Sequence, residues 1–483
     1  MHVSKVILFS ILALASNATA SASDPKRSMA DEMPEKWQYV SEFNQKLPPN
    51  DQWWKSFNDP MLDSLIAEGV NNNFNVLMAI RRIEIARQNI RQARSAFFPS
   101  INASAGWTKN RNSGLTTRNE IDATTIDYFS LGVDMNWEID IFGKVAAGVK
   151  ERKAQWQASR AEYAATMVSL CSEIASTYIQ LRAYQAELKV TRHHLEQQKK
   201  VLDIVEARHE ATLNSELDVA QSKSIYYSTT AAIIPIETSI SSAINALAVL
   251  TGTYPEQMSQ RLADAAPLPD YKKIISVGVP MQLLRRRPDI LQAEYDLSAY
   301  AAALGIAKKD FLPTLSLTGS IGTAAHDASD LFKDKSLTYA IAPKLTWTIF
   351  DGMARKASVA AARQQMEAGI DNYNMTLLTA IQEVDNAMTA YVNASRYIDI
   401  LKQTLQQSER FYEVSLIQYT EGLTQYTPVA DAQIDMLQYA NQAVTAHCQA
   451  LTALIDIYKS LGGGWEIDGN IPYAQTDNKT TQR

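Results

Sequence analysis

The chain has 483 residues, of which 46% are hydrophobic and 20% are charged, and this composition excludes a wholly disordered protein. The formal net charge is −6 and the sequence has no block of Lys or Arg, so we expect no nucleic-acid partner. Two cysteines, Cys171 and Cys448, are too few for a disulfide framework or a four-cysteine zinc site, and the sequence leaves open whether they pair.

The first 22 residues have the features of a secretory signal peptide. Lys5 precedes an apolar run at 6–15, and small residues with an Ala-x-Ala cleavage site follow that run. No cysteine lies near the site, so we expect a mature chain without a lipid anchor. No later stretch contains 18 consecutive apolar residues, and we therefore expect an exported protein without a membrane-spanning helix.

Four segments alternate apolar and polar residues with the period of a β-strand. They lie at about 99–109, 128–141, 313–322 and 337–350. A length of about ten residues, with one apolar face and one small or acidic face, is typical of transmembrane β-strands, although any one segment alone could be a half-buried strand of a soluble protein. As membrane strands they are expected to turn three aromatic side chains toward lipid, namely Trp137, Trp347 and Tyr339.

A very long helix is predicted after each pair of strands, at about 144–211 and 353–419. Apolar residues recur every seven positions in both segments, for example from Met167 to Leu202, and the whole chain has only 18 Gly and 16 Pro. Such a repeat predicts left-handed supercoiled helices. A helix of about 68 residues is roughly 100 Å long, three times the thickness of a bilayer core.

The two halves of the sequence are copies of one unit. Trp137–Gly143 recurs as Trp347–Gly352, with the tryptophans 210 residues apart, and Ala96–Ile101 recurs as Asp310–Leu315 at an offset of 214. A period this long indicates an internal duplication and not a solenoid. The expected organisation is a signal peptide at 1–22, an N-terminal periplasmic segment at 23–61, a first repeat at 62–252, a linker at 253–280, a second repeat at 281–465 and a tail at 466–483.

Four strands cannot close a barrel, and lipid does not tolerate open sheet edges. Three chains of four strands give twelve, an even number within the range of bacterial barrels. We therefore predict a mixed α+β membrane protein: a homotrimer whose twelve-stranded outer-membrane β-barrel continues as a periplasmic α-helical coiled-coil barrel. The two hairpin loops, at about 109–127 and 323–336, are expected outside the cell.

Three sequence motifs resemble those of the TolC-like outer membrane efflux family. They are Leu283–Ile290, with Gly305–Ala307 and Phe311–Pro313 after it; Trp53–Leu62; and Tyr419–Gln433. The resemblance extends from about residue 50 to Trp465. It implies the branch of the family that works with an inner-membrane resistance-nodulation-division pump and a periplasmic adaptor protein. Many members of that branch are lipoproteins, and this chain departs from them because it lacks the lipid-bearing cysteine.

The most specific of these motifs is an arginine-rich block that precedes a predicted helix. Pro288 suits the first position of a helix, and Asp289 complements the positive helix start. The arginines are expected to bind carboxylates in the middle of the helical tunnel. We favour a structural role for the block, which consists of Arg285, Arg286, Arg287, Pro288 and Asp289.

The sequence contains no enzymatic or metal-binding constellation that we recognise. It has no Gly-rich phosphate loop, no Gly-x-Ser-x-Gly and no His-Glu-x-x-His. His193 and His194 are adjacent on a long helix and so point to different faces, unlike an i, i+4 metal pair. We expect no catalytic activity, no cofactor and no metal.

The turns at about 207–218 and 419–431 are the predicted free ends of the tunnel, where a gate and an adaptor-docking site are expected. Asp431 and Asp435 are spaced i, i+4 and share a helix face, and the resemblance implies a gating role for Asp431. If this face lines the lumen, threefold symmetry makes each position a ring of three carboxylates. The alternative is an ordinary exposed acidic face. Thr427 belongs to the same predicted gate and stands where the family commonly has a larger apolar residue.

The predicted function is that of a passive exit duct in the outer membrane of a Gram-negative bacterium. It would conduct small molecules, such as drugs and toxic compounds, that the pump and adaptor deliver. One alternative is a duct for secreted polypeptides in a type I secretion system. Another is a trimeric membrane anchor or a structural coiled-coil protein.

Overall fold

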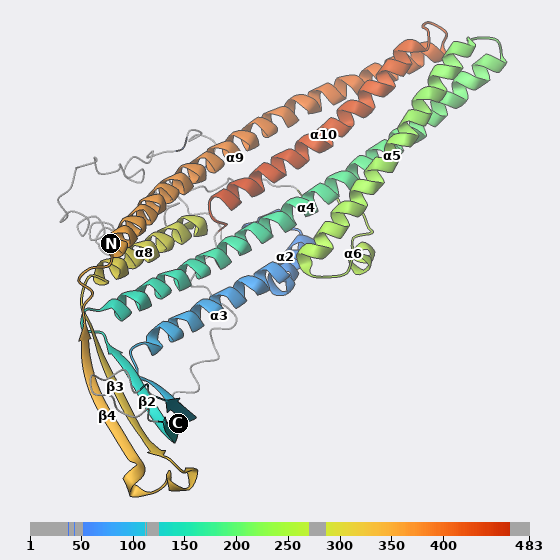
Figure 1. The fold of residues 1–483 in the computed structure, drawn as a ribbon. Coiled ribbons are helices and arrows are strands. Elements are labelled where there is room, and N and C mark those ends of the chain that lie inside the picture. The colour runs from blue at the N-terminus through green and yellow to red at the C-terminus, as the bar shows by residue number, and fades with distance from the viewer. Residues whose placement is uncertain are drawn as a thin grey trace. The chain divides into compact units, whose positions relative to one another are not determined.

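The computed structural model describes residues 37, 43, 52–111, 113, 125–269 and 286–463 (Figure 1). The predicted signal peptide, the C-terminal tail, Arg285 and parts of the first hairpin loop and of the linker lie outside these residues. The first half contains a 3₁₀-helix η2 (Trp53–Phe57), α2 (Pro60–Asn72), α3 (Phe74–Ser95), β1 (Ser100–Arg111), β2 (Thr125–Ile139), α4 (Lys144–Glu210), α5 (Glu216–Thr251) and α6 (Pro255–Arg261). The second contains α8 (Pro288–Lys309), β3 (Thr314–Ala325), the 3₁₀-helices η4 (Ala328–Asp330) and η5 (Asp334–Ser336), β4 (Leu337–Thr346), α9 (Ala354–Thr420) and α10 (Thr427–Ser460).

The same order of elements occurs twice. The series α3-β1-β2-α4-α5 recurs as α8-β3-β4-α9-α10, and α4 and α9 each have 67 residues. The chain nevertheless divides into two compact units that each draw on both halves. Among the described residues, unit one holds 82–111, 113, 125–159 and 292–373, and unit two holds 37, 43, 52–81, 160–269, 286–291 and 374–463.

Unit one contains a four-stranded antiparallel sheet in the order β1-β2-β3-β4. Its register keeps the two predicted faces apart. Asn102, Asp134, Ser320 and Ala340 form one polar row across the four strands, whereas Val133, Ile321 and Tyr339 form an apolar row. The apolar face is open to solvent in the single chain, with Tyr339 77% and Ile341 76% exposed. Alternation of this kind, with apolar residues outside, is the pattern of a membrane strand.

The last strand is shorter than the sequence suggests. β4 ends at Thr346, whereas the alternating pattern continues to residue 350. Side chains take over the backbone bonding here: the Trp347 indole donates to the Phe311 carbonyl, and the Arg355 guanidinium donates to the Thr348 carbonyl. The alternation of apolar and polar residues therefore continues past Thr346, where the backbone hydrogen bonds between β3 and β4 end.

Unit two is a helical assembly whose core lies where the heptad pattern is strictest. Met167, Ile174 and Leu181 on α4 are fully buried, as are Leu377 and Val384 on α9. Further along α4 the buried seam becomes polar. Its members there are Thr191, His194 and Gln198. Polar residues in a coiled-coil seam lower stability and specify register.

The cysteines are not paired with each other, which answers the point that the sequence leaves open. Cys171 is buried in α4, and this burial raises the pKa of its thiol to about 12. Cys448 is half-buried in α10, and its pKa is also raised by burial. Both thiols are therefore protonated and unreactive at neutral pH.

Among the described residues, α5 is long and apolar enough to cross a membrane by length and composition alone. The sequence criterion is a run of 18 consecutive apolar residues, which α5 does not contain. Ser and Thr residues interrupt the apolar run of α5, but its mean hydropathy stays high enough for a membrane-spanning helix. Ile244 and Leu247 of this helix are buried in unit two, but only 28% of its most apolar 18-residue stretch is buried in the single chain.

Candidate functional site

The arginine-rich block builds a clamp at the start of α8, within unit two. Arg287, only 7% exposed, donates from Nη1 to the Ser460 carbonyl at 2.8 Å. The same guanidinium binds Asp289 through Nε at 3.0 Å and Nη2 at 2.6 Å. Its Nη1 also lies 2.7 Å from Glu383 Oε2 on α9. One side chain therefore ties the start of α8 to α9 and to the end of α10.

Burial alone opposes the charge on Arg287. The hydrogen bonds and charges of Asp289 and Glu383 outweigh burial, so the pKa of Arg287 is raised above its ordinary value. Asp289 has a second task, because its Oδ1 accepts from the Ile290 backbone N–H at 2.9 Å in the first turn of α8. Pro288 is the first residue of that helix, and the backbone carbonyl of Arg286 packs against Gly462.

The first repeat contains the same clamp with different chemistry. Asn73, 4% exposed, donates from Nδ2 to the Leu250 carbonyl at 2.9 Å and accepts from the N–H groups of Asn75 and Val76. The offset of 214 found in the sequence relates Asn73 to Arg287, and the offset of 210 relates Leu250 to Ser460. The two clamps therefore occupy equivalent positions of the two repeats. Nothing in the residue types connects Asn73 with Arg287, so sequence reasoning missed this counterpart.

Close backbone packing accompanies both clamps. Gly252 has φ +68° and Gly462 has φ +87°. A Cβ on Gly252 would lie 2.6 Å from the Asn72 carbonyl oxygen, and one on Gly462 would lie 2.9 Å from that of Arg286. Both positions therefore need glycine, for conformation and for space.

The strand–helix junctions of unit one are also duplicated. Trp137 Nε1 donates to the Phe97 carbonyl and Trp347 Nε1 to the Phe311 carbonyl, each at 3.0 Å. Trp137 is half-buried and Trp347 is 61% exposed. Each indole thus fixes the start of one strand to the end of the next, while its ring remains on the apolar side of the sheet, as does that of Tyr339.

Carboxylates cap the start of both long helices at these junctions. Asp140 accepts from the N–H groups of Val145 and Ala146. Asp351 accepts from the Arg355 N–H and binds its guanidinium at 2.6 Å, which lowers the pKa of Asp351. A carboxylate at a helix start is favoured by the helix dipole.

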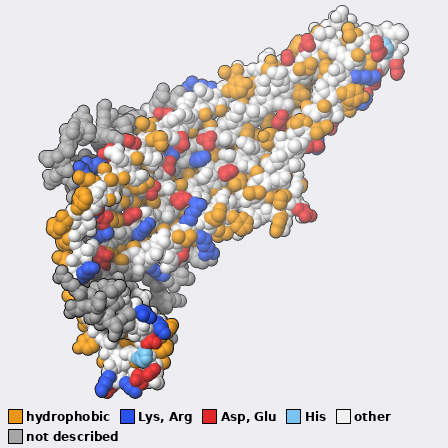
Figure 2. All heavy atoms as spheres, in the orientation of Figure 1, with side chains coloured by type: hydrophobic (Ala, Val, Ile, Leu, Met, Phe, Trp, Pro, Cys, Tyr) orange, Lys and Arg blue, Asp and Glu red, His pale blue; other side chains and the backbone are white. Residues whose placement is uncertain are grey.

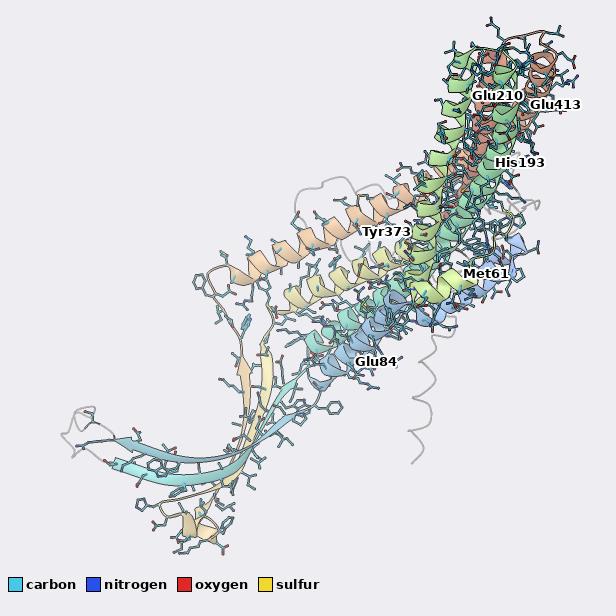
Figure 3. The ribbon with its side chains drawn as sticks, turned by 90° about the vertical axis from the view of Figure 1, so that its right-hand side faces the viewer. Met61, Glu84, His193, Glu210, Tyr373 and Glu413 are labelled. Carbon is cyan, nitrogen blue, oxygen red and sulfur yellow. The ribbon has the colours of Figure 1, made fainter. Side chains whose placement is uncertain are left out.

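The predicted free ends are two tight turns with one geometry, in unit two. After α4, the Leu213 N–H donates to the Arg208 carbonyl at 2.8 Å, and after α9, the Leu423 N–H donates to the Gln418 carbonyl at 2.8 Å. The residue before each leucine has positive φ: Thr212 at 61° and Gly422 at 73°. This is a Schellman-type helix end. Figure 3 labels Glu210, the last residue of α4, and Glu413, which lies about two turns before the end of α9.

An apolar cluster packs the two hairpins against each other behind these turns. Figure 2 shows acidic side chains at the surface around the same ends, where Glu210, Glu216 and Glu421 are exposed. All four long helices or their turns contribute to the cluster. Its buried members are Val201, Val205, Val219, Ile225, Tyr419, Tyr426, Val429 and Ala430.

Polar contacts reinforce this packing between hairpins. Arg208 donates to the Thr420 carbonyl at 2.9 Å, and its guanidinium lies 4.9 Å from the centre of the Tyr419 ring. Asn214 Nδ2 donates to the Tyr419 hydroxyl at 3.1 Å. Sequence reasoning did not single out Arg208 or Asn214, because contacts across 205 residues or more leave no local signal.

The predicted gate residues lie on α10 beside this cluster. Ala430, Ala432 and Gln433 are buried, whereas Asp431 is exposed and Asp435 is half-buried. Asp431 therefore faces away from the packed side of the helix. Within the part of the chain that the structure describes, neither carboxylate has a salt-bridge partner. Thr427 is the exposed first residue of α10.

His193 and His194 point to different faces of α4, as the sequence predicts. His193 is exposed and lies 3.0 Å from Gln197, whereas His194 is buried. Burial is the main cause that lowers the pKa of His194, and the neighbouring His193 adds to it. Among the described residues, no group of three or more His, Cys, Asp or Glu side chains could hold a metal ion.

Comparison with known proteins places this architecture. The family model described as outer membrane efflux protein matches residues 65–253 and 279–463, once for each repeat. The chain is 28% identical over 441 residues to the pyoverdine export outer membrane protein OpmQ of Pseudomonas aeruginosa, covering 90% of this chain and 92% of OpmQ.

A second relative and a solved structure are similar to this chain over almost its whole length. The toluene efflux pump outer membrane protein TtgC of Pseudomonas putida is 26% identical over 445 residues and is covered over 91% of both chains. The solved outer-membrane channel OprN superposes with a TM-score of 0.84 at 27% identity, covering 93% of this chain and 99% of OprN. With both repeats matched, the chain belongs to the outer membrane efflux protein family.

Proposed function

We propose that this protein is the exit duct of a tripartite efflux system, a passive channel through the outer membrane. The sheet carries the proposal. Its outer face is apolar and exposed, its other face is lined by small and polar residues such as Asn102, Asp134 and Ser320, and long helices follow both hairpins. A soluble protein has no use for such an exposed apolar face, whereas lipid covers it at no cost.

Closure of the duct requires further copies of the chain. β1 and β4 are the edges of the four-stranded sheet, and an unpaired edge is not stable in lipid. Three copies give a twelve-stranded barrel, for which the polar faces form the lumen. The long helices then continue from the barrel into the periplasm.

The hairpin ends are the proposed gate and docking site. Asp431 and Asp435 would line the lumen as two rings, with Thr427 beside them at the start of α10. At about 6 Å and an effective dielectric of about 20, two carboxylates repel by roughly 3 kcal/mol. Rings of this kind would favour cations and oppose a tightly closed end. A periplasmic adaptor would dock on the outer side and would connect the duct to an inner-membrane resistance-nodulation-division pump.

Drug accumulation in cells tests this function. A strain that lacks the gene should accumulate several structurally unrelated fluorescent substrates, and the chain supplied in trans should restore their export. Deletion of a neighbouring pump gene should give the same phenotype without an additive effect. Unchanged accumulation together with the loss of a secreted protein would favour the type I secretion alternative.

A further inference from the structure

The two β-hairpins are equivalent residue by residue. In the first, Ser100 pairs with Asn136, and in the second, Thr314 pairs with Thr346. Adding 214 to each β1 number and 210 to each β2 number converts the first pair into the second, and the same holds along both ladders. The two tryptophan-to-carbonyl bonds obey these offsets as well. The offsets are thus a property of the backbone and not only of the sequence.

The first repeat contributes β1 and β2 to the sheet, and the second contributes β3 and β4. The pairing of β2 with β3 therefore shows how the strands of one repeat join those of the next. Asn136 lies opposite Thr318 there, and Trp137 lies opposite Leu317. In the proposed trimer the next such joint is the boundary between two chains, because β4 is the second strand of the second repeat as β2 is the second strand of the first. β4 would then meet β1 of the neighbouring subunit.

From this relation we infer the register of the seam between subunits, an inference that rests on the proposed trimer. Applying the two offsets to Asn136 and Thr318 places Thr346 opposite Ser104 of the next subunit. Two residues further along, Lys344 faces Gly106 of the next subunit. On the other face Leu345 meets Ala105 of the next subunit, and Pro343 meets Trp107 of the next subunit.

The chemistry of the strands fits this register. Leu345, Ala105 and Trp107 belong to the apolar face, and Thr346 and Ser104 belong to the polar face, so both faces continue across the seam. A slip of one residue would turn polar residues toward lipid. A slip of two residues would leave the apolar and polar residues on their faces, so it is the alternative register that the experiment must exclude.

The seam differs from the joint within the chain at one end. Within the chain, Lys309 Nζ donates to the Gly143 carbonyl at 2.6 Å, and Lys144 forms a 2.6 Å salt bridge with Asp310. The offset of 214 converts Lys309 and Asp310 into Ser95 and Ala96, which cannot form these ionic bonds. The seam therefore lacks the counterparts of these two bonds.

Cysteine pairs across the seam test the register in outer membranes. A directly opposite pair has Cα atoms about 4.5–5.5 Å apart, within the range of a disulfide, whereas a diagonal pair is at about 7–8 Å. Thr346→Cys is combined in turn with Asn102→Cys, Ser104→Cys and Gly106→Cys. All these positions lie on the polar face, which an aqueous oxidant can reach.

The expected result is a shift of the denatured protein from monomer to covalent dimer and trimer on a non-reducing gel, with the highest yield for the Ser104 combination. The matched control is Asn136→Cys with Thr318→Cys, the equivalent pair within one chain, which should form a disulfide without a change in oligomer size. Single-cysteine variants control for Cys171 and Cys448.

Two failures can be told apart. A maximum at Asn102→Cys or Gly106→Cys would overturn the register and leave the trimer intact. No intersubunit product with any of the three combinations, while the intrachain control still forms its disulfide, would overturn the trimer itself and with it this architecture of the duct.

Discussion

The clamps at the starts of α3 and α8 perform the same tasks with different side chains. Asn73 alone donates to the Leu250 carbonyl near the end of α5 and accepts N–H groups from the first turn of α3. Arg287 has donors only, so it binds the Ser460 carbonyl, and the task of accepting an N–H passes to Asp289. The backbone geometry has been retained in both copies while one residue's function has been divided between two.

The hairpin ends also share a backbone geometry, but here the side chains that follow the turn do not perform a common task. Thr212 and Gly422 close equivalent turns, yet the chemistry beyond the turn is not shared. The offset of 210 places Gln221 and Ile225 of the first repeat where the second has Asp431 and Asp435. Backbone anchors are thus common to the two repeats, whereas the acidic positions are specific to the second repeat. The following variants test this contrast.

Charge insertion into the apolar face should have the largest effect. Val133→Arg on β2 and Ile341→Arg on β4 should each destabilise the proposed barrel by about 2–4 kcal/mol if they lie near the midplane of the bilayer. Asn136→Arg and Thr346→Arg, on the polar face, should be tolerated. Urea unfolding of the protein in vesicles measures the difference. Equal tolerance on both faces would contradict placement of the sheet in lipid.

Removal of the central side chain should lower stability more at the Arg287 clamp than at the Asn73 clamp. Arg287→Ala leaves Glu383 and Asp289 without their cation, and we expect a loss of about 3 kcal/mol, the lower end for a broken buried pair because both carboxylates are partly exposed. Asn73→Ala should cost about 1–2 kcal/mol through a lost cap and a lost hydrogen bond. Both values come from denaturant unfolding. Equal losses would mean that the charge of Arg287 adds nothing.

Asp431→Ala should remove most of the cation preference of the channel. In the proposed trimer, three negative charges at a narrow point would bias the local field toward cations, and their loss should shift the reversal potential in a salt gradient toward zero. Gln221→Ala, the equivalent change in the first repeat, is the matched control and should be silent. Planar-bilayer recording decides the outcome. If Asp431→Ala and Asp435→Ala were both silent, these carboxylates would lie on the outer surface.

The tryptophan junctions should respond alike. Trp137→Phe and Trp347→Phe each remove one indole-to-carbonyl hydrogen bond and keep an aromatic ring, so each should cost about 1 kcal/mol. Thermal unfolding of the two single variants provides the comparison. A difference of more than about 1 kcal/mol between them would show that the two junctions are not energetically equivalent.

The smallest effect is expected at the loop after β3, where His326 Nδ1 lies 2.8 Å from Asp127 Oδ1. The hydrogen bond to the Asp127 backbone, followed by the charge of Asp127, raises the pKa of His326. A raised pKa means that this contact contributes below pH 6.5 and is lost as the pH rises through the higher value of the folded state. Tryptic cleavage of the loop, expressed as wild type relative to His326→Asn, should therefore be slower at pH 6 than at pH 8. A ratio that does not change with pH would exclude this contact as a pH-dependent one.

Much of the fold was predictable because its signals are periodic. Heptads located α4 and α9 to within a residue or two, and alternation located the four strands, although it could not show that side chains replace the ladder beyond Thr346. The clamp partner of Arg287 was not predictable, since Ser460 and Glu383 are distant in sequence and a backbone carbonyl carries no residue signature. The contact of Arg208 with Tyr419 was missed for the same reason.

The pairing of β2 with β3 has a consequence for how the protein is made. Residues 140–313 lie between these two neighbours in the sheet, so the second hairpin reaches the first only after the whole of α4, α5, α6 and α8 has been produced. At roughly 5–20 residues per second of synthesis, the first hairpin exists for about 10 s or more with both edges free. Such edges aggregate readily, and non-local pairing is slow. Biogenesis of this chain should therefore depend on a holding chaperone that covers β1 and β2 until β3 arrives.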